Sequence, residues 1–587
     1  MNFRKILLVS ILLIPSAFSY AENQLNPIVV GASVAPTDIH SSPASVDILT
    51  AVDIKNKGYR NVADLLNSLS SINISTNGGF GQLTSVFTRG TESNHTKFIL
   101  DGVELNPGTI AMAAIQNIPV HTIEKIEIIK GTSSSLHGSN TIGGIVNIIT
   151  KKNNNGIIVS AGSWSTSNST LLKSFNHDDL DIQLNISRME SKSFPAKTSS
   201  TKRHGYNSND ISLDIGKTIL DYTLATKIFS STGNTQYDNF GSNADQDHDD
   251  YFYTINLKKS IGQDELNIGY TKSQNKILQN VTNYLGFIDF TKTLRDKYEI
   301  SYTKIDKRFL NKFGLNYTKE HMSEKSFSQR YTIDPIVREL FYQGDYISSS
   351  NIVNYGLRQI HHSQFGSFTA GNFGLSLINN DDVYSFNINR AFRSPDGTDN
   401  YGYKGNPNLL PEESLSYEVS MKRFLNKNFM VRGSIFVTDI KNLIAVDGAQ
   451  VQNIDESEIT GYEINAQYDD NLFEYNFSYT YMNPKDKTNN EVLAKRSKHK
   501  LNTGVTYKLS NKSSMNLNIV GEGEKNASYF STTMLGSYYI ANLNYNVDIS
   551  NSSLNLSLKN LFDKEYRNSD GYNTADRSFF VTYSLNY

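Results

Sequence analysis

The stretch Ser578-Phe579-Phe580-Val581-Thr582-Tyr583-Ser584-Leu585-Asn586-Tyr587 alternates between two kinds of side chain. Every second position from Phe579 to Tyr587 is apolar or aromatic, and the positions between them are Ser, Thr or Asn, with the exception of Phe580. Successive side chains of a β-strand point to opposite faces. This stretch therefore predicts a strand with one apolar face and one polar face, ending on an aromatic residue.

The same period of two recurs through the chain after residue 155. The clearest apolar sets, separated mostly by Ser, Thr, Asn, Asp and Lys, are Ile211/Leu213/Ile215, Leu266/Ile268/Tyr270, Tyr298/Ile300/Tyr302 and Phe473/Tyr475/Phe477/Tyr479/Tyr481. A soluble β-sandwich also alternates, but residues 156–587 are far more than a sandwich needs. Transmembrane strands of about 10 residues, with their turns and loops, fill that length. We therefore predict a membrane all-β fold, a large transmembrane antiparallel β-barrel of about 22 strands.

The composition agrees with strands that face two environments. Tyr (34) and Phe (30) are plentiful although only 38% of the residues are hydrophobic, and aromatic residues favour strands. The net charge of −2 argues against nucleic acid as a partner, because phosphate binding needs a basic surface. The chain has no Cys, which excludes disulfides and thiolate metal sites.

The first residues predict export. Arg4 and Lys5 precede an apolar run, residues 6–14, and Ser19-Tyr20-Ala21 offers small residues at the two positions that a signal peptidase reads. We predict a signal peptide over residues 1–21. No later segment is apolar enough for a membrane helix, and a closed barrel is the other fold that satisfies every backbone group in lipid.

A different pattern occupies residues 41–152. Residues 61–69 predict a helix, capped by Asn61, in which Val62, Leu65, Leu66 and Leu69 share one face. Residues 123–129 and 142–150 predict strands, and residues 131–138 a compact turn. We predict a small α/β domain over residues 41–152, a flexible segment over 22–40, and the barrel over 153–587.

Ordered motifs in this α/β region resemble the TonB-dependent receptors of bacterial outer membranes. The motifs are Phe87–Thr91, Phe98–Val103, Ile126–Gly131, Leu136–Ser139 and Ile142–Thr150. The aromatic end of the last strand is similar to the signal by which outer-membrane barrels are recognised for assembly. The resemblance implies a plug domain inside the barrel lumen, residence in the bacterial outer membrane, energy-dependent import and no enzyme activity.

Six plug residues are expected to have structural roles. Gly143 and Gly144 would allow close backbone packing. The other four, which we expect to form polar bridges to the inner wall of the barrel, are Arg89, Asp101, Glu127 and Lys130.

Near the start of the exported chain lies a segment that resembles a TonB box. Its residues are Pro27, Ile28, Val29, Val30, Gly31 and Ala32. Extended β-branched residues suit the addition of a strand to a partner's sheet edge. The resemblance implies the TonB–ExbB–ExbD energy-transducing complex as partner, and the alternative is an ordinary first strand of the plug.

Within the family, four segments resemble the vitamin B12 (cobalamin) receptors. They are Asn77–Ser85, Tyr401–Leu409, Leu493–Lys498 and Asn560–Tyr566 together with Gly571–Arg577. The resemblance implies a monomeric receptor in outer-membrane lipid that binds cobalamin or a related small molecule. By position it implies ligand contacts from seven residues, namely Leu83, Ser85, Glu92, Ile110, Ala111, Lys495 and Tyr529. Glu92, Ile110 and Ala111 differ from the pattern of those receptors.

No cofactor is required by this resemblance, but it implies a calcium site in the extracellular loops. The carboxylates expected to hold calcium are Asp238, Asp245 and Asp247, since calcium prefers oxygen ligands. The facing loop of the B12 receptors is acidic, whereas here it reads Thr201-Lys202-Arg203-His204-Gly205. A solvated acidic loop paired with these cations is the alternative.

Other functions are alternatives to this one. A haem receptor is favoured by Phe392–Pro395 and Asn406–Leu409, but no His lies between these two motifs. A ferric-siderophore receptor is a further alternative. A passive porin or adhesin needs neither plug nor TonB box, and an outer-membrane enzyme would need a nucleophile elbow or metal motif that this sequence lacks.

Overall fold

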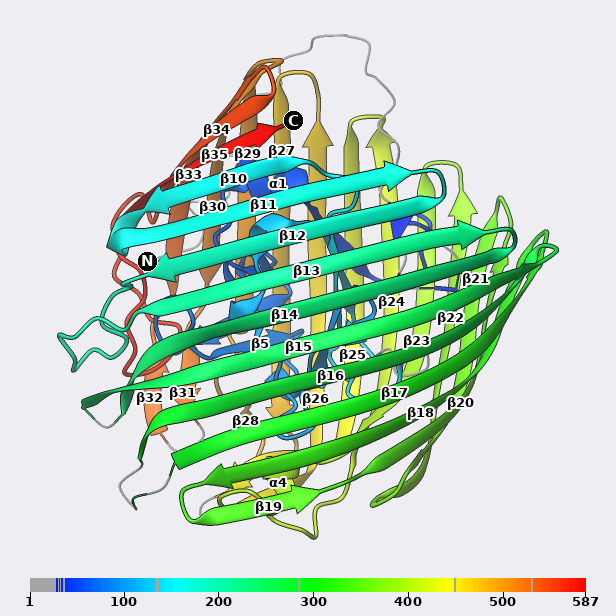
Figure 1. Ribbon diagram of the computed structural model, residues 1–587, viewed down its shortest axis with the longest axis horizontal. Helices are drawn as coiled ribbons and strands as arrows, with labels where there is room; N and C mark the ends of the chain where they lie inside the picture. The colour runs from blue at the N-terminus through cyan, green and yellow to red at the C-terminus, as the bar shows by residue number, and fades with distance from the viewer. Residues whose placement is uncertain are drawn as a thin grey trace.

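The computed structural model describes residues 28–29, 31, 33–34, 37–132, 137–239, 241–282, 286, 288–447, 450–528 and 531–587. A closed antiparallel β-barrel surrounds a small α/β domain in its lumen (Figure 1). The fold expected from the sequence is confirmed, including the number of 22 barrel strands in the described part of the chain. The segment predicted to be a signal peptide lies outside the described residues.

The long strands of the barrel follow one another around the wall in chain order. They are β10 (Gly156–Gly162), β11 (Thr166–His177), β12 (Leu180–Ser191), β13 (Tyr206–Ile219), β14 (Tyr222–Asn239), β15 (Ser242–Ile261), β16 (Asp264–Thr282), β17 (Ile288–Asp306), β18 (Phe309–Ser326), β20 (Ile336–Ile347), β21 (Asn351–His362), β22 (Gly366–Asn379), β23 (Asp382–Arg393), β24 (Glu412–Asn426), β25 (Phe429–Asp447), β26 (Gln450–Asp469), β27 (Phe473–Asp486), β29 (His499–Ser510), β30 (Ser513–Glu522), β33 (Tyr538–Ile549), β34 (Ser552–Lys559) and β35 (Ser578–Asn586).

Shorter elements lie in the connections between these strands. They are η5 (Ser163–Ser165), β19 (Gln329–Ile333), α4 (Gly397–Tyr401), β28 (Glu491–Val492), β31 (Lys525–Ser528) and β32 (Ser531–Leu535). The barrel closes where β10 pairs with β35, with Ile157 opposite Leu585 and Ala161 opposite Val581. The alternating stretch at the end of the sequence is thus the closing strand of the wall.

The two ends of the barrel differ in the length of their connections. Pairs such as Asp178-Asp179 and Asn511-Lys512 form tight turns at one end, which we call the short-turn end. Segments 192–205, 394–411 and 560–577 connect strands at the other, the long-loop end. Outer-membrane barrels carry short turns on the periplasmic side and long loops outside. Helix α4 and strand β19 lie at the long-loop end, at the bottom of Figure 1.

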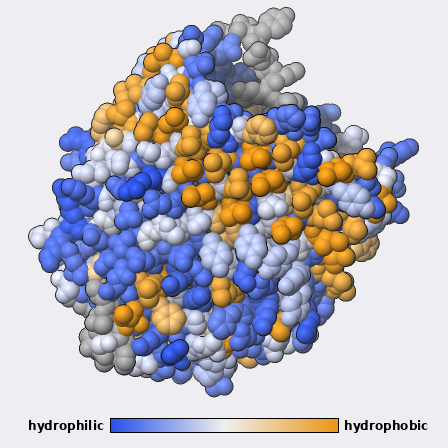
Figure 2. Space-filling view, in the orientation of Figure 1, coloured by the Kyte–Doolittle hydropathy of each residue, from blue (hydrophilic) through white to orange (hydrophobic). Residues whose placement is uncertain are grey.

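The outer face of the wall is apolar, as the period of two predicts. Exposed side chains on strands β13, β14, β16, β18 and β20 include Ile211, Ile228, Ile268, Leu315 and Leu340. Figure 2 shows such residues gathered across the barrel, with a more hydrophilic region at the lower left. Tyr253, Tyr270, Tyr298 and Tyr317 form one row of ring contacts on neighbouring strands, as expected of an aromatic girdle. Within the described residues, no helix has the length and hydropathy to cross a membrane.

The plug contains two short helices and a mixed sheet of strand order β3-β8-β9-β6-β7. Its elements are β1 (Ile28–Val29), β2 (Thr37–Asp38), β3 (Val46–Thr50), α1 (Ala51–Lys57), α2 (Val62–Asn67), β4 (Ile72–Thr76), β5 (Thr84–Thr88), η2 (Ser93–His95), β6 (Thr96–Leu100), β7 (Val103–Glu104), η3 (Ile115–Asn117), η4 (Val120–Thr122), β8 (Ile123–Lys130) and β9 (Gly144–Thr150). Strands β4 and β5 form a separate hairpin.

Local sequence explains the second helix. The side chain of Asn61 caps α2 by accepting the backbone N–H of Asp64 at 2.7 Å, as predicted. Val62, Leu65 and Leu66 are completely buried in the plug core. Asp64 accepts from the N–H of Arg60, so it does not close a reciprocal box with Asn61.

Two glycines permit the close packing expected of them. A Cβ on Gly143 would lie 2.3 Å from Thr91 Oγ1, and one on Gly144 would lie 2.2 Å from the carbonyl oxygen of Ile129. Gly144 also has a φ of +130°, which side chains rarely adopt. Larger residues at either position would push the plug strands apart.

Candidate functional site

The β4–β5 hairpin forms part of the plug surface that faces the long loops. A Cβ on Gly78 would lie 2.8 Å from Cβ of Ala196, which belongs to the long loop 192–205. Leu83, in the hairpin turn, is 47% exposed, and Ser85 on β5 is half-buried. A large apolar side chain in this position is available to cover a ligand.

Glu92 and Lys495 lie close together although they are far apart in sequence. Glu92 precedes η2 and forms an ion pair with Arg496, the residue after Lys495. Arg496 also donates to the carbonyl of Gly90 at 3.1 Å and lies over the ring of Phe87. Burial lowers the pKa of Lys495, while the charge of Glu92 opposes that shift. Glu92 thus fastens the plug to the connection before β29.

The other predicted contact residues lie elsewhere. Ile110 is half-buried and Ala111 is buried in the plug loop after β7, and Ala111 has a left-handed φ of +49°. Tyr529 lies outside the described residues. Among the residues that the structure describes, no hydrogen bond or ion pair joins Leu83 or Ser85 to the remaining predicted positions. The predicted contacts therefore lie in three places: Leu83 and Ser85 on the β4–β5 hairpin, Glu92 beside Lys495, and Ile110 with Ala111 in the loop after β7.

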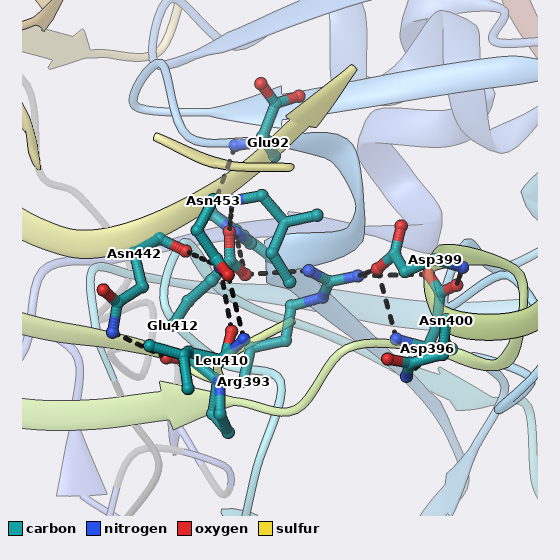
Figure 3. Close-up of polar contacts among 12 residues, drawn as sticks. Glu92, Arg393, Asp396, Asp399, Asn400, Leu410, Glu412, Asn442 and Asn453 are labelled. Carbon is teal, nitrogen blue, oxygen red and sulfur yellow. Dashed lines mark hydrogen bonds and ion pairs between the residues drawn. The ribbon is translucent and has the colours of Figure 1, made fainter. Parts of the chain in front are cut away.

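A buried polar network connects the plug with the long loop 394–411 (Figure 3). His95 Nε2 lies 2.9 Å from Oε2 of Glu412, the first residue of β24. The same carboxylate oxygen accepts from Arg393 at 2.8 Å, and Arg393 also donates to Asp396 at 3.0 Å. His95, Glu412 and Arg393 are completely buried. Charges in such a place are costly unless paired, so the network holds these elements in one arrangement.

Both ends of this network are fixed by backbone contacts. The N–H of Glu92 donates to His95 Nδ1 at 3.2 Å, which leaves Nε2 as the donor to Glu412. At the other end, Asp396 and Asp399 form the reciprocal cap of α4. The N–H groups of Gly397 and Thr398 donate to plug carbonyls. The loop that contains α4 thus lies directly on the plug.

A second buried cluster fastens the plug to strands β24 to β26. Arg89 makes a bidentate pair with Glu418, at 3.0 Å for both contacts, and a 2.8 Å contact with Glu463. Lys130 contacts Glu463 at 2.5 Å and Asp47 at 3.2 Å. Although burial works against the charge, the two glutamates raise the pKa of Arg89. The expected bridges from Arg89 and Lys130 to the wall are present.

The other two predicted bridges differ from each other. Asp101 contacts Lys227 of β14 at 2.5 Å, so it does reach the wall. Among the residues that the structure describes, no hydrogen bond or ion pair joins Glu127 to the wall, and the bridge expected from it is not found there. Its carboxylate accepts from Asn147 at 3.0 Å and pairs with Lys125 at 2.8 Å, both within the plug. β8 is an interior strand of the plug sheet, so Glu127 is completely buried there.

The segment that resembles a TonB box is docked on the plug. Ile28 and Val29 form β1 and pair with β2, whereas Pro27, Val30 and Ala32 lie outside the described residues. The N–H of Gly31 donates to Glu127 at 2.9 Å, and its carbonyl accepts from His137 Nε2 at 2.6 Å. Burial lowers the pKa of His137 to about 4, so the ring is neutral near pH 7.

Two of the three predicted calcium ligands, Asp245 and Asp247, lie together, whereas Asp238 is paired elsewhere. Asp238 pairs with Lys197 at 2.9 Å, while Asp245 and Asp247 both accept from Asn234. Across the described residues, no three His, Asp or Glu side chains are grouped so as to hold a metal. The calcium site stays a prediction from resemblance.

A cavity of about 400 Å³ separates the plug from the inner faces of strands β16 to β21. At the long-loop end it reaches Ala111 and the α4 residues Gly397 and Asn400. At the other end it reaches Gly31 and Val34, beside the docked β1 segment. The cavity therefore extends from a predicted ligand loop to the segment expected to bind an energy-transducing partner.

The sequence predicted ligand contacts on the β4–β5 hairpin, but it did not predict the buried network around Glu412. Phe392–Pro395 and Asn406–Leu409 stood out only as motifs. Their spacing brings Arg393 and Glu412 to the two ends of one loop, where adjacent strands β23 and β24 pair. One sequence signal could have predicted this network. An arginine and a glutamate flank a proline-containing loop between two predicted strands.

Comparisons with known proteins agree with this architecture. Residues 166–561 match the family described as "TonB dependent receptor-like, beta-barrel", and residues 38–145 match "TonB-dependent Receptor Plug Domain". The chain is 26% identical to the vitamin B12 transporter BtuB of Vibrio vulnificus and 25% identical to that of Photobacterium profundum, with 97% of each chain covered in both cases. A crystal structure of a ferric enterobactin receptor (PfeA) mutant from Pseudomonas aeruginosa superposes with a TM-score of 0.80 at 16% identity, covering 92% of this chain and 98% of that one.

Proposed function

The chain belongs to the TonB-dependent receptor family of outer-membrane proteins, and on that premise we propose that it imports vitamin B12 or a related corrinoid. The observation that supports import is the cavity that extends from Ala111 to Gly31. It lies along the direction in which a ligand would cross the membrane. The ligand assignment rests on full-length similarity to vitamin B12 transporters.

In this proposal, a partner protein supplies the energy for import. We assign that partner as the TonB–ExbB–ExbD complex, recruited through residues 27–32. Strand β1 is only two residues long and pairs with another two-residue strand. Such a short pairing is easily exchanged for a longer one with a partner's sheet edge.

The exposed Leu83 supports an apolar contact with the ligand. A corrin has broad apolar faces, and its rim carries neutral amide groups. Covering Leu83 would remove its exposed apolar surface from water, and full burial of a leucine contributes about 1.5–3 kcal/mol. The half-buried Ser85 beside it offers a hydroxyl to the rim.

The charges of the cavity also favour a neutral polar ligand over a multiply anionic ferric catecholate. Its basic lining residues are Lys97, Arg295, Lys297, Lys312 and Arg358, and its acidic ones are Glu104, Glu299, Glu320, Glu339 and Asp396. A wall in which the two signs balance gives a polyanion no net attraction. It does offer both donors and acceptors to amides.

Calorimetry with the purified full-length receptor tests the ligand assignment. We expect cyanocobalamin to bind, with or without calcium, and Leu83→Ala to weaken binding about tenfold, which corresponds to about 1.4 kcal/mol. Val52→Ala is the matched control, because Val52 is 64% exposed on α1, away from the hairpin. No heat with cyanocobalamin, together with binding of haem or of a ferric siderophore, would replace the ligand assignment.

A further inference from the structure

The plug is fastened unevenly to the wall that surrounds it. On the β24–β26 side, Arg89 and Lys130 enter the buried charge cluster with Glu418 and Glu463. Arg432 of β25 joins it through Asp47 at 2.6 Å. Breaking one buried pair of this kind costs about 3–5 kcal/mol. This side of the plug is therefore the harder one to detach.

On the opposite side, the cavity takes the place of such a cluster. Arg295 donates to the carbonyls of Glu104 and Asn106 at 3.2 and 2.8 Å. Thr293 and Thr109 meet through their hydroxyls at 3.2 Å. Single hydrogen bonds contribute about 0.5–1.5 kcal/mol each, and those to charged groups about 1.5–3 kcal/mol. These contacts are individually weaker than the paired charges of the other side.

The side chains of the cavity wall are already paired with each other. Arg358 pairs with Glu339 at 3.0 Å and Lys297 with Glu299 at 3.1 Å, each within the barrel. The plug's Lys97 and Glu104 pair likewise at 3.1 Å. Arg295 of β17 and Glu104 of the plug bridge the two surfaces at 3.8 Å. When the surfaces separate, Arg295 keeps Glu320 at 2.5 Å and Glu104 keeps Lys97 at 3.1 Å, so neither of these buried charges loses its last partner.

The docked β1 segment connects directly to the plug face of the cavity. Gly31 is bonded to His137, and the carbonyl of His137 accepts from Lys97 Nζ at 2.8 Å. Gly31, His137 and Lys97 all line the cavity. A pull on residues 27–32 therefore acts first on the plug surface that faces strands β16 to β21.

We propose that the cavity along strands β16 to β21 is the passage for the ligand, opened when the plug moves away from this wall while it stays fastened to β24–β26. The inference rests on the proposed import function and specifies its route. In the closed form, about 400 Å³ is too small for a corrinoid. The passage widens by breaking the contacts of Thr293 and Arg295 with the plug. Its charge-balanced lining suits a neutral ligand rich in amides.

Two engineered disulfides test the route, and the absence of native Cys makes both unambiguous. Thr109→Cys with Thr293→Cys fastens the plug to β17 beside the cavity, where the two hydroxyls lie 3.2 Å apart. Ser70→Cys with Thr480→Cys fastens it to β27, away from the cavity, where the hydroxyls lie 2.9 Å apart. All four residues are at least 95% buried, so the pairs are matched. A short bis-maleimide can close either pair if oxidation is incomplete.

Binding and uptake of labelled cyanocobalamin are measured separately on whole cells. We expect the oxidised Thr109–Thr293 pair to bind ligand but to lose uptake, and reduction to restore it. The oxidised Ser70–Thr480 pair should take up ligand within about twofold of the parent. Uptake that survives the first disulfide, or that is abolished by the second, would overturn the proposed route.

A measurement that assumes no particular ligand separates this proposal from the ligand assignment. Two single-cysteine variants are treated with a membrane-impermeant maleimide in cells grown in complex medium. Thr318→Cys places the thiol in the cavity wall, and Thr480→Cys places it away from the cavity. Labelling of Thr318→Cys should rise several-fold relative to the same variant lacking residues 26–32, and Thr480→Cys should stay protected. Equal labelling of Thr318→Cys with and without those residues, or labelling at Thr480→Cys instead, would refute the route even if cyanocobalamin binds.

Discussion

His95 of the plug and Glu412 of the barrel share a 2.9 Å hydrogen bond between side chains that are both completely buried. The bond joins residues 317 positions apart in sequence. Because the same oxygen of Glu412 accepts from Arg393, the contact fixes the plug, β24 and the α4 loop relative to one another.

Replacing Glu412 by Gln should destabilise this junction. Arg393 would keep Asp396 and Asp399, so we expect a loss of about 3 kcal/mol, the lower end of the range for a broken buried pair. The loss of unfolding free energy is measured by urea unfolding of the plug, with hydrogen exchange as the readout. Glu413→Gln is the control, because Glu413 pairs with Arg390 on the exposed face, where pairs contribute about 0–1 kcal/mol. Equal effects of the two changes would contradict the assigned role.

The charge cluster at Arg89 should show strong coupling. In a double-mutant cycle with Arg89→Gln and Glu463→Gln, we expect an interaction free energy of about 2 kcal/mol, within the usual range for contacting residues. The exposed pair Arg188–Glu190 supplies the matching control cycle, with an expected value below about 1 kcal/mol. Additivity of the Arg89 and Glu463 changes would mean that the plug is not fastened there.

Gly31→Ala should release the docked β1 segment. A Cβ at this position would lie 3.0 Å from both Glu127 Oε2 and Ile129 Cδ1, so the neighbours must shift or the segment must leave. We expect faster hydrogen exchange at Ile28 and Val29 and tighter binding of a soluble TonB fragment. Gly433→Ala is the control, since an added Cβ there meets nothing within 4 Å. Unchanged exchange in Gly31→Ala would show that Gly31 does not hold the segment.

The stability of the plug should fall as the pH is lowered from about 6.5 to 4. Burial lowers the folded-state pKa of His137 to about 4 from 6.5, so the unfolded plug binds the proton first. The stabilisation is complete above pH 6.5 and is lost by about 1.4 kcal/mol per pH unit as the pH falls towards 4. His121, with a pKa lowered to about 3 by burial, adds to the slope. His137→Gln should reduce the slope of unfolding free energy against pH, whereas the exposed His177→Gln should not.

The barrel could be predicted from the sequence because its rule is local. The alternation from Phe579 to Tyr587 needs only the strand's period of two, and the exposed Phe579 and Tyr583 confirm the face assigned to them. The helix capped by Asn61 depends on a contact three residues away. Interactions of this range are visible in sequence without knowledge of the fold.

For the contacts between plug and barrel, the sequence predicted which plug residues need charged partners but not which barrel residues those partners are. The sequence marked Arg89 and Lys130 as charges that need partners, but Glu463 lies 374 positions from Arg89, and the register of the barrel strands decides which carboxylate faces it. Among the described residues, Glu127 instead has its partners Asn147, Lys125 and Gly31 within the plug, although Lys130 on the same strand reaches the wall. A charge on a strand does not indicate which neighbour covers it.

Deleting residues 26–32, in cells that have no other cobalamin receptor, tests whether this receptor imports its ligand by an energy-dependent route. Uptake and surface binding of labelled cyanocobalamin are compared with those of the full chain. We predict that uptake is lost while binding is retained, because the ligand loops lie at the opposite end of the plug from Gly31. Unchanged uptake in the deletion variant would contradict the account.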